Sequence, residues 1–130
     1  MIHSLLTTKA IFTLLQNSGE LGEMLPSGNI YSIAAVESTQ YPFCTIHRQS
    51  ILPYSSKDGR YMETVTVQIN VVHTSYKDGL LIADKIREVL EKNTYSDDDI
   101  TISRTLLSGA VEQFYNNAYI QTLTFTCDVS

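Results

Sequence analysis

Residues 65–90, VTVQINVVHTSYKDGLLIADKIREVL, change their hydrophobic spacing halfway along, and this change decides the fold. In the first part apolar and polar side chains alternate, which is typical of an antiparallel strand with one buried face. The apolar side chains of that strand are Val65, Val67, Ile69 and Val71. After the SYKDG segment, apolar residues recur every three or four positions and predict an amphipathic helix that ends near Asn93. Its apolar stripe consists of Ile82, Ile86, Val89 and Leu90.

The SYKDG joint between this strand and this helix contains Lys77 and Asp78, and such joints often carry functional residues. A catalytic lysine needs a desolvating pocket, which a polar turn does not provide. Asp78 is suited to the helix N-terminus, either as the N-cap residue or as a negative charge on the helix dipole. Gly79 is expected to ease a tight turn, and His73 is expected to be a partly buried structural residue at the strand end. The joint is therefore predicted to be structural.

The N-terminal residues predict a helix followed by a loop. Apolar residues in the segment 4–17 fall on one helical stripe, and Ser4 or Thr7 is a candidate N-cap. Residues 18–29, SGELGEMLPSGN, contain several glycines and a proline, which predict a loop.

Two short strands are expected next, over residues 30–38 and 43–51. Pro42 lies between Tyr41 and Phe43, and aromatic neighbours raise the cis fraction of an X–Pro bond. The trans form is nevertheless favoured by its lower energy, so a trans bond is predicted.

Residues 52–62, LPYSSKDGRYM, are polar and predict a long hairpin loop before the central strand. Further strands are predicted over residues 100–107 and 120–129. The connection between these two strands is expected to be irregular, with a turn at Asn116 and Asn117.

The predicted order is helix, three strands, helix and two strands. This order indicates an α+β fold with a mostly antiparallel sheet of four to five strands and two helices packed on one face. A length of 130 residues predicts a single domain over residues 1–130.

Charge and hydropathy exclude several classes of protein. The net charge is −5, and 9 Lys and Arg residues are spread along the chain, so no basic stripe for a phosphate backbone is expected. No apolar run approaches the roughly 20 residues that cross a bilayer, so no membrane partner is predicted. The N-terminus lacks the pattern of a signal peptide, which predicts a location in the cytoplasm of the producing cell.

The sequence predicts no catalytic, metal or cofactor site. His3, His47 and His73 are far apart and form no metal-binding spacing. The segment TYSDDD, residues 94–99, lacks the glycine and later glutamate of a calcium loop and is expected to be a solvated loop. No nucleophile, dinucleotide or phosphate-loop motif occurs. The two cysteines, Cys44 and Cys127, lie in apolar runs and are predicted to be buried thiols rather than a disulfide.

Tyrosines gather in or beside the predicted loops. Tyrosine is favoured in protein interfaces because it buries much area at a small entropic cost, although tyrosines also commonly flank strands. Only 18% of residues are charged, which fits either a surface that partners cover or a surface rich in Thr, Ser and Asn. The loop tyrosines are Tyr54, Tyr61, Tyr76, Tyr115 and Tyr119.

Three segments together resemble a known family: LPSGNIYSIAAVESTQYPFCTIH, VTVQINVVHTSYKDGLLIADKIREVL and EQFYNNAYIQTLTFTCDV. In this order, over nearly the whole chain, they resemble the tail completion or tail terminator proteins of long-tailed bacteriophages and prophages. The resemblance implies a small, non-enzymatic α+β subunit without a cofactor. Such subunits close into a ring, usually of six, that caps the head-proximal end of the tail tube and helps to join the tail to the head.

The resemblance also implies partners and a contact region. The partners would be further copies of the chain, the tail tube protein and a head completion or neck protein, while DNA would pass through the channel without specific binding. The chain would occur in the host cytoplasm during assembly and then in the virion tail, and the isolated subunit could be a monomer. The hairpin loop would contact a neighbouring subunit or project into the lumen, unless it is simply a mobile loop. Its candidate contact residues are Tyr54, Lys57, Asp58, Arg60 and Tyr61.

Three alternatives to a tail terminator remain open at this stage. The first is another virion joining component, such as a neck or head–tail connector protein. The second is an unrelated small binding module that uses its sheet for a ligand or peptide. The third is an enzyme, which requires a concave pocket with convergent polar groups near His47 or His73.

Overall fold

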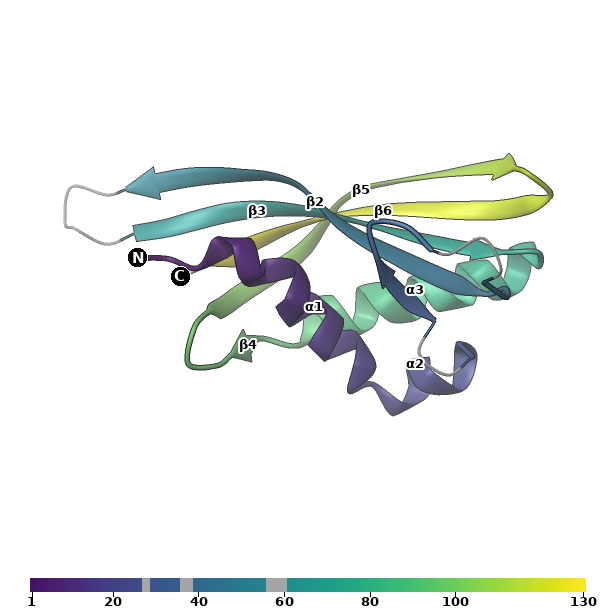
Figure 1. Cartoon of the computed structure of the whole chain (residues 1–130), viewed down its shortest axis with the longest axis horizontal. Coiled ribbons are helices and arrows are strands. Elements are labelled where there is room, and N and C mark those ends of the chain that lie inside the picture. The colour runs from purple at the N-terminus through teal and green to yellow at the C-terminus, as the bar shows by residue number, and fades with distance from the viewer. Residues whose placement is uncertain (27–28, 36–38, 56–60) are drawn as a thin grey trace.

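The fold is an α+β arrangement in a computed structural model that describes residues 1–26, 29–35, 39–55 and 61–130. A curled sheet lies above a layer of helices (Figure 1). The helical elements are η1 (Ser4–Leu6), α1 (Thr7–Gln16), α2 (Gly19–Met24) and α3 (Tyr76–Lys92). The strands are β1 (Ile30–Ser32), β2 (Phe43–Ser55), β3 (Tyr61–His73), β4 (Tyr95–Ser96), β5 (Thr101–Tyr115) and β6 (Ala118–Val129).

The six strands form one mixed sheet in the order β1-β2-β3-β6-β5-β4. Only the β1–β2 pair is parallel among these described strands, and the other four pairs are antiparallel. The predicted α+β class and mostly antiparallel sheet are confirmed. The predicted number of four to five strands was too low, because the segment TYSDDD contributes the short strand β4 at the sheet edge.

The alternation predicted for residues 65–71 is confirmed in β3. Val65, Val67, Ile69 and Val71 are completely buried, whereas the polar side chains between them are half-buried on the opposite face. On that opposite face Asn70 links neighbouring strands, because it donates to Thr45 Oγ1 over 3.2 Å and accepts from Thr122 Oγ1 over 2.7 Å. The sheet therefore has one apolar face and one face of hydroxyl and amide groups.

The helices cover the apolar face, as predicted (Figure 1). Helix α3 packs on β3, β5 and β6, while α1 packs on β2 and on α3. The predicted stripe of α3 is correct for Ile82, Ile86 and Leu90, which are buried, and Val89 is partly buried. Hydrophobic burial of this stripe is the main favourable term that fixes α3 on the sheet.

Helix α3 begins earlier than the sequence suggested, and Ser75 is its N-cap. The Asp78 N–H donates to Ser75 Oγ over 3.3 Å, so Asp78 lies in the first turn, where its charge suits the helix dipole. The alternative in which Asp78 itself is the N-cap is wrong. Gly79 lies inside α3 rather than in a turn. A Cβ atom added at Gly79 would lie 3.5 Å from the Cβ atom of His73, which is an ordinary van der Waals contact. His73 is partly buried as predicted, and its Nδ1 accepts from the Ser75 N–H over 3.1 Å.

Replacing Ser75 with alanine is expected to lower the free energy of unfolding by about 1 kcal/mol, because the cap of α3 is lost. Chemical denaturation of Ser75→Ala would measure the change. Ser50→Ala, on an exposed position of β2, serves as the control and should change the free energy by less than about 0.5 kcal/mol. Equal losses in the two variants would contradict the capping role of Ser75.

The segment 18–29, predicted as a loop, contains helix α2. The Leu21 N–H donates to Ser18 Oγ over 3.3 Å, and Leu21 is buried in the core. Lys85 of α3 also forms an ion pair with Glu20 of α2. Tertiary contacts thus stabilise a short helix despite its two glycines, which lower its intrinsic propensity. At the start of the chain, neither Ser4 nor Thr7 caps α1 with its side chain, because the turn η1 precedes it.

Five strands differ in length from the prediction, and β3 and β6 begin earlier than predicted, at Tyr61 and Ala118. The described part of the 30–38 segment is extended only in β1, and residues 36–38 lie outside the described residues. Strands β2 and β5 continue to Ser55 and Tyr115, because antiparallel pairing with β3 and β6 stabilises segments that look like loops in sequence.

Two local predictions about turns can be compared with the structure. The turn at Asn116 and Asn117 is confirmed, with φ of 52° and 62°, values that asparagine tolerates well. The bond between Tyr41 and Pro42 is cis, so the predicted trans form is wrong. The ring of Tyr41 stacks on that of Phe43 at a centroid distance of 5.7 Å, a contact that sequence spacing alone did not reveal.

Candidate functional site

The hairpin predicted as the contact region joins two strands of 13 residues each, β2 and β3. Tyr54 and Tyr61 lie in the paired ends of these strands, opposite Met62 and Ser55 respectively. Lys57, Asp58 and Arg60 lie outside the described residues. Within β2, Leu52 is 67% exposed, which leaves an apolar side chain available for contact. The role of this hairpin in subunit contacts stays a prediction.

A second hairpin, formed by β5 and β6, lies at the opposite end of the sheet (Figure 1). The strand register shows why: Glu63 of β3 pairs with Val129 of β6, and His73 pairs with Tyr119. The end of β2 and the start of β3 are therefore near the C-terminal end of β6, while the β5–β6 turn is near its N-terminal end. We refer to residues 109–120 as the β5–β6 arm.

An aromatic and acidic cluster anchors the arm to the start of α3. The Tyr76 hydroxyl donates to the two carboxylate oxygens of Glu112 over 3.0 and 2.9 Å, and Gln121 Nε2 donates to Glu112 Oε2 over 3.0 Å. The ring of Tyr119 lies between those of Tyr76 and Phe114, at centroid distances of 5.3 and 4.8 Å. The hydrogen bond to Glu112 raises the pKa of Tyr76, because the phenol stays protonated to donate it.

The arm also exposes large apolar side chains on both of its faces. Val111 is 68% exposed, Phe114 60% and Tyr115 71%. Sequence spacing did not reveal the arm as a unit, because residues 108–119 were expected to form an irregular connection. The available signal was the Asn–Asn turn flanked by apolar and aromatic residues, which is typical of a tight hairpin. Exposed apolar groups on a projecting hairpin indicate a surface that a partner covers.

The hollows near the histidines hold no constellation of catalytic groups among the described residues. One of about 310 Å³ is lined by the polar residues Thr8, Ser32, His47 and Arg48, together with Ile33 and Ile46. A smaller one of about 180 Å³ contains His73 and Asp78, but His73 Nδ1 is already bonded to the Ser75 N–H. Ser32 shares the first hollow with His47, but no hydrogen bond joins a serine hydroxyl or a thiol to a histidine side chain among the described residues, so neither hollow shows an activated nucleophile.

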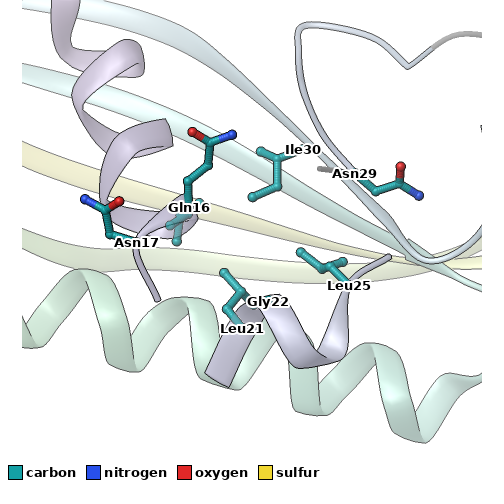
Figure 2. Close-up of a pocket in the computed structure, with 8 residues that line it drawn as sticks. Gln16, Asn17, Leu21, Gly22, Leu25, Asn29 and Ile30 are labelled. Carbon is teal, nitrogen blue, oxygen red and sulfur yellow. The ribbon is translucent and has the colours of Figure 1, made fainter. Parts of the chain in front are cut away.

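A larger hollow of about 400 Å³ lies between α1, α2 and β1 (Figure 2). Leu21, Leu25 and Ile30 contribute its apolar side chains, and Gln16 and Asn17 contribute amides at the end of α1. A further amide, that of Asn29, is engaged elsewhere, because its Nδ2 donates to the carbonyl oxygens of Gln40 and Pro42 and its Oδ1 accepts from the Tyr31 hydroxyl. The hollow is thus the seam where three elements meet.

Comparison with known proteins identifies the family. The profile of the family described as "Tail completion protein gp17" matches residues 9–118, most of the chain. The chain belongs to the tail completion protein gp17 family. The resemblance inferred from the sequence is therefore confirmed. No curated protein matches the sequence.

The fold of this tail completion protein also occurs in a solved virion. A chain in the structure described as "Virion of native gene transfer agent (GTA) particle" superposes with a TM-score of 0.81 and covers 94% of this chain and 92% of that chain. The two sequences are 12% identical, so this similarity concerns the fold alone.

Family membership settles the broad class of function. The tail completion protein is a structural, non-enzymatic component of the virion tail, so the enzyme alternative is wrong. No group of His, Cys, Asp and Glu side chains that could hold a metal occurs in the described part of the chain. Among the described residues, none of the helices is long and apolar enough to span a membrane.

Both cysteines of the tail completion protein are free and buried, as predicted. Burial raises the pKa of Cys44 to about 12 and that of Cys127 to about 11. The Thr105 hydroxyl lies 3.7 Å from Cys127 Sγ and donates to it. The two thiols therefore pack in the core as small apolar side chains.

Proposed function

We propose that the protein is a tail terminator, which closes into a ring on the head-proximal end of the tail tube and helps to join the tail to the head. The observation that supports this most directly is the pair of hairpins at opposite ends of one sheet, in a member of a tail completion family. A ring needs two different surfaces on each subunit, because a heterologous contact closes only when one surface meets the other. The resemblance implies a ring of six, with residues 1–130 acting as one domain.

The proposed partners are other copies of this chain, the tail tube protein and a head completion or neck protein. The hairpin with Tyr54, Lys57, Asp58, Arg60 and Tyr61 is one proposed contact region. The channel would let DNA pass without specific binding, which is compatible with a net charge of −5. Assembly would take place in the cytoplasm of the bacterial host.

Disruption of the gene tests the terminator role. Without a terminator, tube polymerisation is not stopped, so electron microscopy of lysates should show overlong tubes without heads. Supplying the intact gene in trans should restore tails of uniform length. Tails of normal length beside unattached, DNA-filled heads would contradict termination and favour the neck or connector alternative.

A further inference from the structure

The outer edges of the sheet are only partly covered. Strand β4 pairs with β5 only at Thr101 and Ile102, and the Glu91 carboxylate accepts from the Leu107 N–H over 2.8 Å. Beyond the irregularity between Leu107 and Gly109, the outer side of β5 has no strand partner among the described residues. On the other side of the sheet, β1 pairs with β2 only at residues 44–46. Unpaired edges present rows of backbone donors and acceptors that can pair with another strand.

The backbone N–H and C=O groups of Glu112 point outward from the β5 edge of the sheet. The Asn116–Asn117 turn joins Tyr115 directly to its partner Ala118, and such two-residue hairpins close with a hydrogen-bonded flanking pair. Alternate residues then direct their N–H and C=O groups outward, which places those of Ala110, Glu112 and Phe114 on the free edge.

The backbone N–H and C=O groups of Arg48 point outward from the β2 edge of the sheet. The Cys44 N–H donates to the Asn29 carbonyl over 2.9 Å, and the Ile46 carbonyl accepts from the Ile33 N–H over 2.8 Å, both on the outer side of β2. Arg48 is the next residue in this alternation, and it has no strand neighbour there among the described residues. Pro53, which lacks an N–H, limits the stretch that can pair to residues 47–52.

The side chains on these two edges are complementary. Arg48 is paired with Val67, and Glu112 is paired with Gln121, which is paired in turn with Val71. Since Val67 and Val71 share the buried face, Arg48 and Glu112 lie on the same face of the sheet with opposite charges. On the other face each edge carries one exposed apolar side chain, Leu52 on β2 and Val111 on β5, beside the exposed polar side chains of Ser50 and Gln113.

We propose that residues 109–113 of β5 add antiparallel to residues 47–52 of β2 in a second copy of the chain, with Glu112 opposite Arg48 of that copy. Beyond Gln113 the arm leaves this edge, because β1 of that copy occupies the outer side of residues 44–46. The extra residue on the β2 side corresponds to the bulge between Arg48 and Ser50. This inference rests on the proposed ring and names its joint. The strands β2, β3, β6 and β5 alternate in direction, so β5 of one copy is antiparallel to β2 of the next in a head-to-tail arrangement. A second copy therefore offers the free edge that matches in direction, charge and apolar contacts.

Charge reversal tests the joint. Sedimentation velocity over a concentration range up to millimolar would measure self-association of the wild type, Glu112→Arg, Arg48→Glu and the double variant. The wild type is expected to associate beyond a dimer. Each single reversal should weaken association by about tenfold, because it places like charges opposite each other, and the double variant should recover most of the loss. Ala110→Pro, which removes an outward N–H without changing charge, should weaken association as well.

Matched controls separate the joint from general charge effects and from misfolding. Asp84→Arg on α3 and Lys9→Glu on α1 make the same charge changes at exposed positions and should leave association unchanged. Thermal unfolding of each variant checks that it folds. Absence of association in the wild type at millimolar concentration would overturn the proposal, and so would failure of the double variant to recover. Loss in Glu112→Arg alone, with dimers as the final product, would instead indicate a symmetric β5–β5 contact and would also overturn it.

The outcome is independent of the test of tail termination. If gene disruption leaves tail length unchanged while the charge reversals behave as expected, the terminator role is wrong and the joint stands. If disruption gives overlong tubes but the reversals have no effect, the role stands and this joint is wrong.

Discussion

Phe125→Ala is expected to lower the free energy of unfolding by about 3–5 kcal/mol. Phe125 is completely buried and has the largest volume of the fully buried side chains among the described residues. It lies in β6, between Val67 of β3 and Leu107 of β5, and its face of the sheet is covered by α3. Truncation removes apolar burial and leaves a cavity that the hydrogen-bonded strands on both sides cannot readily fill, so the loss should be near the upper end of core substitutions.

Phe114→Ala is the matched control for Phe125, because it makes the same chemical change in the same hairpin at a side chain that is 60% exposed. Its expected loss is below about 1 kcal/mol, most of it from the contact with Tyr119. Urea denaturation at low protein concentration would measure both variants. A loss at Phe125 no greater than that at Phe114 would show that the core is not centred on β6.

Val67→Glu is expected to cost more than about 4 kcal/mol and can prevent folding altogether, because it places a carboxyl group without a partner in the centre of the sheet. Burial would raise the pKa of this carboxyl in the folded state above its unfolded value. Ionisation in the unfolded chain then favours unfolding as the pH rises through about 4.3, so the loss should be smallest in acid and fully developed at neutral pH.

Gln68→Glu, one residue further along β3, is the control for Val67. Its side chain lies on the half-buried polar face, so the carboxylate can stay hydrated and the expected change is below about 1 kcal/mol. Circular dichroism and urea denaturation at pH 4 and pH 7 would compare the two variants. Similar losses at the two positions would contradict the assignment of faces in β3.

The sequence predicted best those elements whose pattern is local and regular. The alternation from Val65 to Val71 and the stripe from Ile82 to Leu90 each report one buried face, so strand and helix could be recognised without knowledge of their partners. Helix α2 was missed because Gly19 and Gly22 lower its propensity, and only contacts such as that of Leu21 with the core stabilise it.

The arm was missed for a different physical reason. Two bulges, near Ser103 and Ser108, shift the alternation of β5, and beyond them both faces are exposed, so no buried face imposes a period of two. The cluster around Glu112 also joins residues far apart in the chain, since Tyr76 belongs to α3. Sequence spacing predicts neighbours along one element and says little about contacts that depend on the register between strands.

The two buried thiols bear on the durability of the particle outside the cell. A virion leaves the reducing cytoplasm and meets dissolved oxygen, where exposed thiolates oxidise or exchange into mixed disulfides. Burial raises the pKa of Cys44 to about 12, so the thiol stays protonated at neutral pH, and the core shields it from oxidants. A tail component built in this way can age in air without chemical cross-linking between particles.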